Sequence, residues 1–140
     1  MNPSITSMVV PHLYLADVSA AITFYKKAFG ASVRWQVDSP NGGTHVAELD
    51  LQQVRIRLHE QSTHIQVLSP ETIKATTVII DLLVNDADAL FARAVAAGAQ
   101  AISPMQTFEY GYRQGTIKDP FGHHWCIERL DDPDKKPTMK

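Results

Sequence analysis

The 140-residue chain lacks several features that would assign it to a class at once. It has a single cysteine, Cys126, so no disulfide can form within it, which fits a reducing compartment such as the cytoplasm. No uncharged apolar run approaches the roughly 20 residues of a membrane-spanning helix. The start, MNPSITSMVVPHLYLADVS, has neither the basic nor the long apolar segment of a secretory leader. We therefore expect a cytoplasmic protein that does not associate with membranes.

An excess of charge is also missing. The formal net charge is −2, with 13 Lys and Arg against 15 Asp and Glu, and the basic residues are scattered along the chain. Binding to nucleic acid leaves a basic patch or stripe, so nucleic acid is not an expected partner. No Ser-His-Asp order, phosphate-cradling glycine loop or HExxH pattern indicates another catalytic class. With 44% hydrophobic residues, the length suits one compact domain spanning 1–140.

What the sequence does contain is an internal repeat. Residues 15–33, LADVSAAITFYKKAFGASV, and residues 84–102, VNDADALFARAVAAGAQAI, follow one plan. Each has β-type residues, an Asp, about three helical turns, a Gly and a return to β-type residues. Asp17 and Asp86 are 86 minus 17, or 69, positions apart, which is about half the chain. This spacing predicts a duplicated unit.

Each unit is expected to fold as a strand, a helix and three further strands. In residues 8–60, Asp17 or Ser19 caps the helix and Gly30 ends it, between the strands MVVPHLYL, SVRWQV, THVAELDL and VRIRLHE. In residues 78–130, Asp86 or Asp88 caps the helix and Gly98 ends it, with the turn DPFG and the strands TVIIDLLV, QAISPM, YRQGTIK and HHWCIERL. Residues 61–77 are expected to be a linker, and residues 131–140 a flexible tail.

The repeated plan and several phrases together resemble the vicinal oxygen chelate superfamily of glyoxalases, bleomycin-resistance proteins and dioxygenases. The phrases are PHLYL, AAITFYKKAFGA, THVAEL, ALFARAVAAGA and DPFGHHWCIE, and they most resemble the PhnB-like branch. The resemblance covers about residues 8 to 129. It implies an α+β fold in which two βαβββ modules form a cupped mixed sheet round one cavity, in a monomer or in a dimer that exchanges modules. We expect a homodimer.

The resemblance also implies where a metal would bind. Metal-using members of the superfamily place a His or Glu on the first and the last strand of each module. Here the first-strand positions fall at Val10 and Ile80, and the last-strand positions at Arg57 and Cys126. Aliphatic side chains have no lone pair and a guanidinium repels a cation, so only Cys126 could bind an ion. We therefore expect no metal cofactor, although a shift of two residues would bring His12 to the first position.

The expected cavity is basic and rich in histidine. Side chains two apart on a strand share a face, so His12 and Tyr14 accompany Val10. The opposite face is expected to pack under the helices through Val54, Ile56, Leu58, Trp125 and Ile127, and Trp35 is expected in the core as well. Paired guanidinium donors favour a small polar or anionic organic ligand. The expected ligand-binding residues are His12, Tyr14, Arg55, Arg57, His59, Tyr110, Arg113, His124, Cys126 and Glu128, with Tyr110 and Arg113 closing over the cavity.

Simpler interpretations stay open beside these. Arg55 and Arg57 could be solvated, His12 could be a hydrogen-bonded strand residue, and His123 a turn-stabilising one. The facing of His45 is undetermined, and Cys126 is inert unless a cation such as Arg57 lowers its pKa.

Three functions remain compatible with the sequence. The favoured one is a metal-free protein that sequesters or carries a small molecule. The second is a lyase, isomerase or dioxygenase that holds Zn, Ni, Fe or Mn through His12, His45, His59 or His124. The third is a metal-free enzyme with His12 or His124 as general base. The sequence does not decide whether the protein is an enzyme, and no catalytic residue is assigned.

Overall fold

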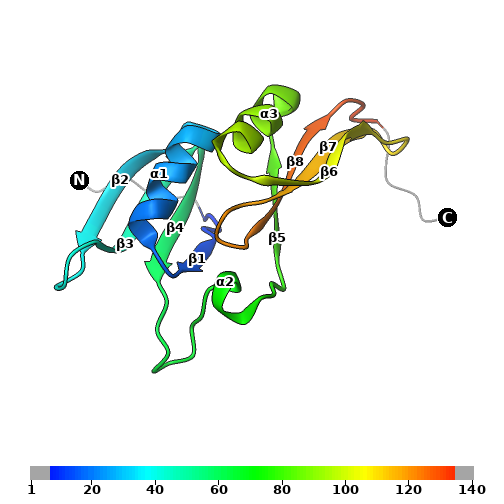
Figure 1. Ribbon diagram of the computed structural model, residues 1–140. Coiled ribbons are helices and arrows are strands. Elements are labelled where there is room, and N and C mark those ends of the chain that lie inside the picture. Colours follow the sequence, from blue (N-terminus) through cyan, green and yellow to red (C-terminus); the bar gives the residue numbers. More distant parts are fainter. Residues whose placement is uncertain (1–6, 135–140) are drawn as a thin grey trace, which may run out of the picture.

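The computed structural model describes residues 7–134, and their strands form two four-stranded sheets, one in each half of the chain (Figure 1). The first half contains β1 (His12–Leu15), α1 (Val18–Phe29), β2 (Ser32–Asp38), β3 (Thr44–Leu51) and β4 (Val54–Glu60). The second half contains β5 (Ile79–Leu83), α3 (Ala87–Ala97), β6 (Gln100–Thr107), β7 (Tyr112–Lys118) and β8 (His124–Leu130). The α+β fold class with two βαβββ modules is confirmed, with one mixed sheet in each module.

The two sheets repeat one another in strand order and in register. Their orders are β1-β4-β3-β2 and β5-β8-β7-β6, with the first and last strands of each module parallel. His12 stands opposite Arg57, and Asp81 stands opposite Cys126. The members of these pairs are related by the same offset, since 81 minus 12 and 126 minus 57 both equal 69. The duplication is therefore visible in the strand pairing as well as in the sequence.

Helix α1 begins and ends where the sequence predicts. The Asp17 side chain accepts a hydrogen bond from the Ala20 N–H at 3.1 Å, which satisfies one of the free donors of the first turn. Gly30 ends the helix at a φ of 68°, in the left-handed region that glycine adopts without steric cost. Helix α3 ends at Gly98 as expected, whereas the Asp86 side chain at its start makes no capping hydrogen bond.

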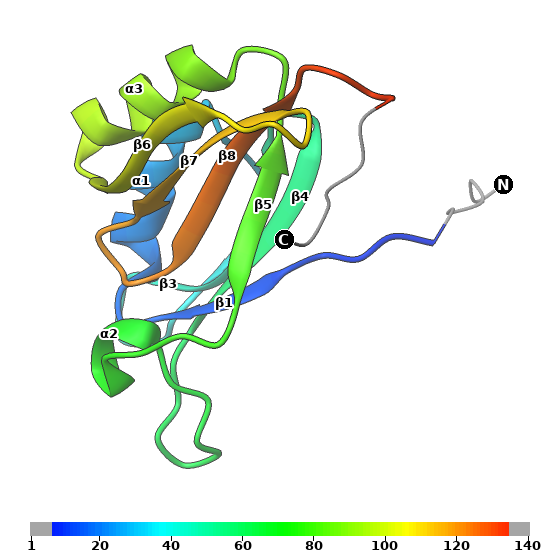
Figure 2. The same cartoon turned by 90° about the vertical axis from the view of Figure 1, so that its right-hand side faces the viewer.

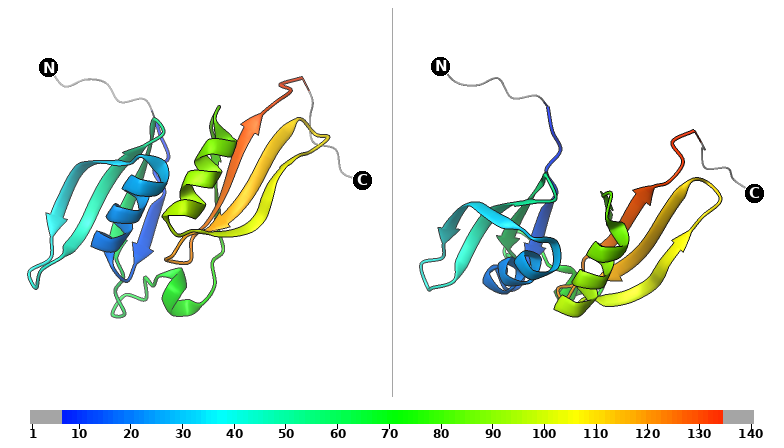
Figure 3. Two further views of the ribbon diagram at one scale, coloured as in Figure 1. Left: turned by 45° about the horizontal axis from the view of Figure 1, so that its top comes forward. Right: turned by 90° about the horizontal axis from the view of Figure 1, so that it is seen from above.

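The two helices lie side by side between the sheets (Figure 3). Each sheet buries the face that meets them. Ile56, Leu58, Trp125 and Ile127 are almost fully buried, as predicted. Val54 is 46% exposed, contrary to prediction, because it opens β4 directly after the turn at residues 52–53, at the end of the sheet. The face of each sheet turned away from the helices is called the open face below.

Trp35 is a second exception to the predicted core. A register shift in β2 between Val33 and Trp35 places Trp35 opposite Glu48, on the open face of the first sheet. The indole is therefore partly exposed and lies under the guanidinium of Arg57, whose central carbon is 5.6 Å from the ring centroid. A β-bulge of this kind turns a side chain to the other face, and alternation alone does not reveal it.

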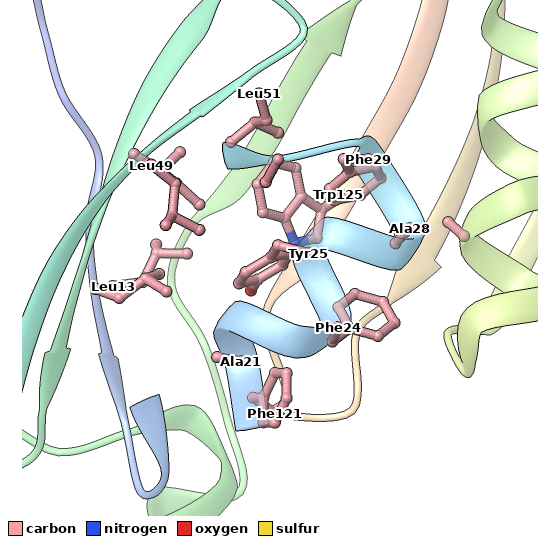
Figure 4. Close-up of a cluster of buried hydrophobic side chains, with 14 of the residues drawn as sticks. Leu13, Ala21, Phe24, Tyr25, Ala28, Phe29, Leu49, Leu51, Phe121 and Trp125 are labelled. Carbon is pink, nitrogen blue, oxygen red and sulfur yellow. The ribbon is translucent and has the colours of Figure 1, made fainter. Parts of the chain in front are cut away.

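The modules are joined by a buried aromatic contact. The Trp125 ring, from β8, packs on Phe29 and Tyr25 of α1, with ring centroids 4.9 and 5.6 Å apart (Figure 4). Trp125 and Tyr25 are at most 1% exposed. Because these rings come from different modules, the hydrophobic core is continuous across the chain.

Asp119, which the sequence indicates only as a turn residue, connects the modules by hydrogen bonds. Its buried carboxylate accepts from the Tyr25 hydroxyl, in the first module, and from the Trp125 indole N–H at 3.0 Å. It also accepts from the backbone N–H groups of Phe121 and His123, both at 3.0 Å. Four donors therefore satisfy one buried carboxylate, which is the condition for burying such a group at acceptable cost.

The linker contains a short helix that the sequence does not predict, α2 (Pro70–Ile73), which lies below the β7–β8 turn and beside β1 (Figure 2). Ser69 caps it by accepting from the Thr72 N–H at 3.2 Å. Gly122 of the DPFG turn has a φ of +91°, and a Cβ there would lie 2.9 Å from the Pro70 Cβ. This close approach requires glycine, so the turn and the linker helix are packed together.

Residues 131–134 remain attached to the second module, because the N–H groups of Asp131 and Asp132 donate to the Gly111 carbonyl at 2.8 and 3.1 Å. The rest of the predicted tail, 135–140, lies outside the described residues. No helix within residues 7–134 is long and apolar enough to cross a membrane.

Candidate ligand-binding site

The register of the two parallel edge strands corrects the positions expected to face the cavity. His12, not Val10, stands opposite Arg57, and Asp81, not Ile80, stands opposite Cys126. Ile80 stands opposite Trp125 and packs against the core. Val10 precedes β1, and the true offset is 69 residues, whereas Val10 and Ile80 are 70 apart. The correct positions lie two residues after Val10 and one residue after Ile80. They are occupied by His12 and Asp81, which are potential metal donors, in place of the two aliphatic side chains.

Within residues 7–134, this corrected set does not bring three donor side chains to one point. Across residues 7–134, no three His, Cys, Asp or Glu side chains are placed to hold a metal together. Burial, followed by the nearby Glu128 and Asp81 carboxylates, raises the pKa of Cys126 to about 11. The group is therefore a thiol near neutral pH in the metal-free protein. Arg57 is not among the groups that shift this pKa.

Aromatic rings gather on the open face of the first sheet. His12 stacks on Tyr14 with ring centroids 5.0 Å apart, and His59 contacts both rings at 5.6 and 5.4 Å. His45 contacts the edge of His59 at 4.5 Å. These four residues are called the ring cluster. Burial, together with nearby His59 and Arg57, lowers the pKa of His12, so its imidazole is neutral at neutral pH.

His45 belongs to this cluster because of an irregularity in β3. Val37 stands opposite Val46 and Asp38 opposite Thr44, which leaves His45 as an extra residue in the strand. The His45 Nδ1 atom lies 2.5 Å from the Glu60 Oε1 atom, so the imidazole donates to the carboxylate. The phrase THVAEL gives no signal for this bulge, which explains why the facing of His45 could not be predicted.

The arginines of the same face are already paired with carboxylates. Arg57 Nη2 donates to Glu48 Oε1 at 2.7 Å, and Arg34 lies 3.3 Å from the same carboxyl group. The Arg55 Nε atom is 3.8 Å from Asp50 Oδ1. Glu48 is only 5% exposed, and the hydrogen bond from Arg57 lowers its pKa. Among the buried side-chain nitrogen and oxygen atoms of the described residues, Arg57 Nε is the one without a hydrogen-bond partner.

Arg113 is not brought together with the other expected site residues. Its guanidinium makes a two-pronged contact with Asp88, in the first turn of α3, at 2.9 and 2.8 Å. Arg113 pairs with Arg129 between β7 and β8, whereas the adjacent pair, Gln114 and Glu128, lies on the open face. Because neighbouring residues of a strand point to opposite faces, Arg113 lies on the helix-facing side of the sheet. The contact leaves Arg113 holding α3 to the sheet.

The open face of the second sheet holds most of the remaining expected residues. Gln114 Nε2 donates to Cys126 Sγ at 3.1 Å, and the Tyr110 hydroxyl donates to the Gln114 side-chain oxygen. The thiol lies 3.5 Å from Glu128 Oε2. Burial, then the nearby Asp81, raises the pKa of Glu128. His124 stands apart from this group, opposite Lys118 at the other end of β8.

A cavity of about 350 Å³ lies where the two modules and the linker meet. We call it the junction pocket. Its polar lining includes His12 and Tyr14 of the ring cluster, and its walls are otherwise largely aliphatic. His123 also lines it, with Nε2 donating to the Tyr14 carbonyl at 3.2 Å, so this residue does more than stabilise the turn. The lining residues are Pro11, His12, Leu13, Tyr14, Leu68, Pro70, Ile73, Ala75, Thr76, Thr77, Val78, Ile80 and His123.

Paired βαβββ modules with a small cavity at their junction define a class of fold, and comparison with known proteins identifies the family. The chain belongs to the Glyoxalase/Bleomycin resistance protein/Dioxygenase superfamily, whose family model matches residues 6–127. The uncharacterized protein Mb0911c of Mycobacterium bovis is 36% identical over 120 residues, which cover 84% of this chain and 79% of that protein.

Solved structures share the fold. TioX from Micromonospora sp. ML1 aligns with a TM-score of 0.70 and 25% identity, over 89% of this chain and 99% of TioX. The genomically encoded fosfomycin resistance protein FosX from Listeria monocytogenes aligns with a TM-score of 0.68 and 15% identity, over 94% of this chain and 97% of FosX. The second likeness shows the fold alone.

Proposed function

We propose that the protein binds a small organic molecule in the junction pocket, without a metal ion, and so sequesters or carries it. The observation that carries this proposal is the pocket, whose volume of about 350 Å³ suits a small ligand. Its walls come from β1 of the first module, from the linker, and from β5 and His123 of the second. A ligand there would contact both modules at once.

The lining favours a ligand with an apolar body and a few hydrogen-bonding groups. Leu68, Ile73 and Val78 offer apolar contact, while the neutral His12 imidazole and the Tyr14 hydroxyl offer polar contacts. The arginines expected to attract an anion are bound to Glu48 and Asp50 and do not line this pocket. We therefore expect His12 and Tyr14 to provide the polar contacts in the junction pocket, and we do not expect an anionic group to bind there.

We also propose that the chain forms a homodimer. The edge strands β1 and β5 each pair on one side only, and apolar side chains beside them are exposed. Val9 is 92% exposed and Ile79 is 57% exposed. The second open face carries Asp81 and Glu128, whereas the arginines of the first are paired with Glu48 and Asp50. A second copy that covers these edges would bury apolar surface.

Light scattering during size-exclusion chromatography tests the dimer. The wild-type protein is expected at twice the chain mass, and Ile79→Lys, on the β5 edge, is expected to shift it to the monomer. Ile102→Lys is the matched control, because Ile102 is also exposed but lies on β6, at the opposite edge of the same sheet. A wild-type monomer across the micromolar range would overturn the dimer.

We propose that the chain belongs, within its superfamily, to the PhnB-like branch and that it is a cytoplasmic protein. The phrases AAITFYKKAFGA and DPFGHHWCIE support the branch, and the single cysteine supports the compartment. FosX is described as a fosfomycin resistance protein, and a sequestering or resistance role is one that we keep open for this chain. At 15% identity, FosX supports only the shared fold and not this role.

A thermal-shift screen of small aromatic and aliphatic compounds tests the binding function. A ligand that binds only the folded state raises the melting temperature, and it should do so in the wild type and in Cys126→Ser, on the far sheet. Thr77→Phe, which fills the junction pocket, and His12→Ala, which removes a polar contact, should lose the shift. An equal shift in all four proteins would place the ligand elsewhere.

Elemental analysis of the untagged protein tests the metal-dependent alternative. The proposal expects no stoichiometric Zn, Ni, Fe or Mn. The ring cluster is where displaced ligands would come from, since His59 contacts both His12 and His45. Stoichiometric metal that is lost in His12→Ala would favour a lyase, isomerase or dioxygenase instead.

A further inference from the structure

Positive charge gathers at a second cavity, on the other side of the segment that contains α2. This cavity measures about 400 Å³ and is lined by Pro70, Glu71, Lys74, Ala75, Lys118, Pro120, Gly122 and His124. We call it the lysine pocket. Pro70 and Ala75 also line the junction pocket, so the two cavities share a wall. The arginines expected to bind an anion line neither cavity.

The other cationic side chains of residues 7–134 are paired or lie at a helix end. Each arginine contacts a carboxylate or a backbone carbonyl, as shown by the contacts of Arg34, Arg55, Arg57, Arg93, Arg113 and Arg129. Lys26 and Lys27 lie in the last turn of α1, where the helix dipole favours positive charge. Lys74 and Lys118 form no ion pair with any described residue, yet both line the same cavity.

The packing of the linker brings these two lysines together from distant parts of the sequence. Lys118 stands opposite His124 in the pairing of β7 with β8, so both side chains leave the same face of the second sheet. Lys74 caps α2 at a φ of 58°, with its N–H bound to the Pro70 carbonyl. The close approach of Gly122 to Pro70 fixes α2 against the β7–β8 turn. Lys74 is thereby held beside the sheet.

We propose that the lysine pocket is an anion-binding site, which takes the phosphate or carboxylate group of a small molecule. Two ammonium groups supply charge-assisted donors, and the His124 imidazole supplies a further polar contact. Glu71 is the one acidic residue in the lining and opposes two lysines. His124 lies on the same face as Lys118, at the end of β8 away from Glu128. It does not depend on a ligand in the junction pocket.

Inorganic phosphate is the first probe, because it has no apolar body for the junction pocket. Isothermal titration calorimetry at constant ionic strength should show saturable binding, with shifts in the backbone NMR signals of Lys74, Gly122 and His124. Malonate in place of phosphate distinguishes a carboxylate site from a phosphate site. The double variant Lys74→Gln/Lys118→Gln should bind the preferred anion about tenfold or more weakly. Glu71→Gln should bind it more tightly.

The double variant Lys26→Gln/Lys27→Gln is the matched control, since it removes the same charge from the end of α1. It should bind the anion as the wild type does. Equal weakening in both double variants would reduce the effect to net charge and overturn the site, as would absence of saturable binding of either anion. Should Lys74→Gln/Lys118→Gln fail to fold, Lys118→Gln alone carries the test, because Lys118 is exposed. Unchanged affinity in that variant would also overturn the site.

Discussion

The open faces of the two sheets share a backbone plan and differ in chemistry. His12 and Arg57 of the first sheet occupy the places that Asp81 and Cys126 occupy in the second. On the first face the acids lie among arginines, whereas on the second Asp81 lies near another carboxyl group and a thiol. The helix-facing sides are apolar in both modules. The duplicated fold therefore preserves the packed side and varies the open side, where function can diverge.

One residue type shows this difference most directly. Glu48, on the first face, has a lowered pKa because Arg57 donates to it. Glu128, on the second, has a raised pKa because it is partly buried and Asp81 lies nearby. The first module thus favours the ionised form of its glutamate, Glu48, and the second module favours the protonated form of its glutamate, Glu128. The two faces should respond to pH with opposite signs.

The largest expected effect comes from disconnecting the two modules at Asp119. Asp119→Ala would leave the Tyr25 hydroxyl, the Trp125 indole and two backbone N–H groups without their acceptor. We expect the free energy of unfolding in urea to fall by about 4 kcal/mol. Asp119→Asn keeps one acceptor oxygen and should lose less. A loss below about 1 kcal/mol in Asp119→Ala would show that Asp119 does not couple the stability of the two modules.

The role of Asp119 shows where sequence reasoning succeeds and where it stops. Alternation and capping residues predict the two modules, the limits of α1 and most of the buried strand faces, because these features depend on neighbouring residues. The phrase DPFG likewise predicts a turn. That Asp119 also accepts from Tyr25, 94 positions away, depends on how the modules dock, and local sequence carries no record of that contact.

The candidate site is harder to predict for the same reason. His12 and Tyr14 line the junction pocket, but the facing of Asp81 depends on a register that an error of one residue reverses. The position of His45 depends on a bulge, and α2 forms in a segment whose sequence is typical of a linker. The sequence gives no sign that Arg57 is already paired, because its partner Glu48 lies on a neighbouring strand.

The next largest effect is expected at Cys126, the thiol of the second face. Its pKa of about 11, against an ordinary value of 9.0, lowers the thiolate fraction at pH 8 about 100-fold. Alkylation by iodoacetamide, followed by mass spectrometry, should therefore be about 100-fold slower in the folded protein than in denaturant. Equal rates in the two states would show that the second face does not suppress the thiolate.

A smaller effect is expected at Glu48, on the first face. Its folded-state pKa lies below its unfolded value, so its contribution is present above the unfolded pKa and is lost as pH falls through the folded pKa. Glu48→Gln should lower the free energy of unfolding by about 2 kcal/mol at pH 7, since Arg57 and Arg34 lose their charged partner. The loss should shrink in acid. Glu71→Gln, at an exposed position, should show neither effect.

The smallest effect has the opposite sign and is expected at Glu128. Its folded-state pKa lies above its unfolded value, so its stabilising contribution is present below the unfolded pKa and is lost as pH rises through the folded pKa. Above that point the ionised group lies near Asp81 and has no ion pair among residues 7–134, so Glu128→Gln should raise the free energy of unfolding by up to about 1 kcal/mol once the carboxyl group is ionised. Urea unfolding of both glutamate variants across a pH series measures the contrast. If Glu48→Gln and Glu128→Gln change stability in the same direction at a pH where both carboxyl groups are ionised, the two modules do not act on their open-face carboxyl groups in opposite ways.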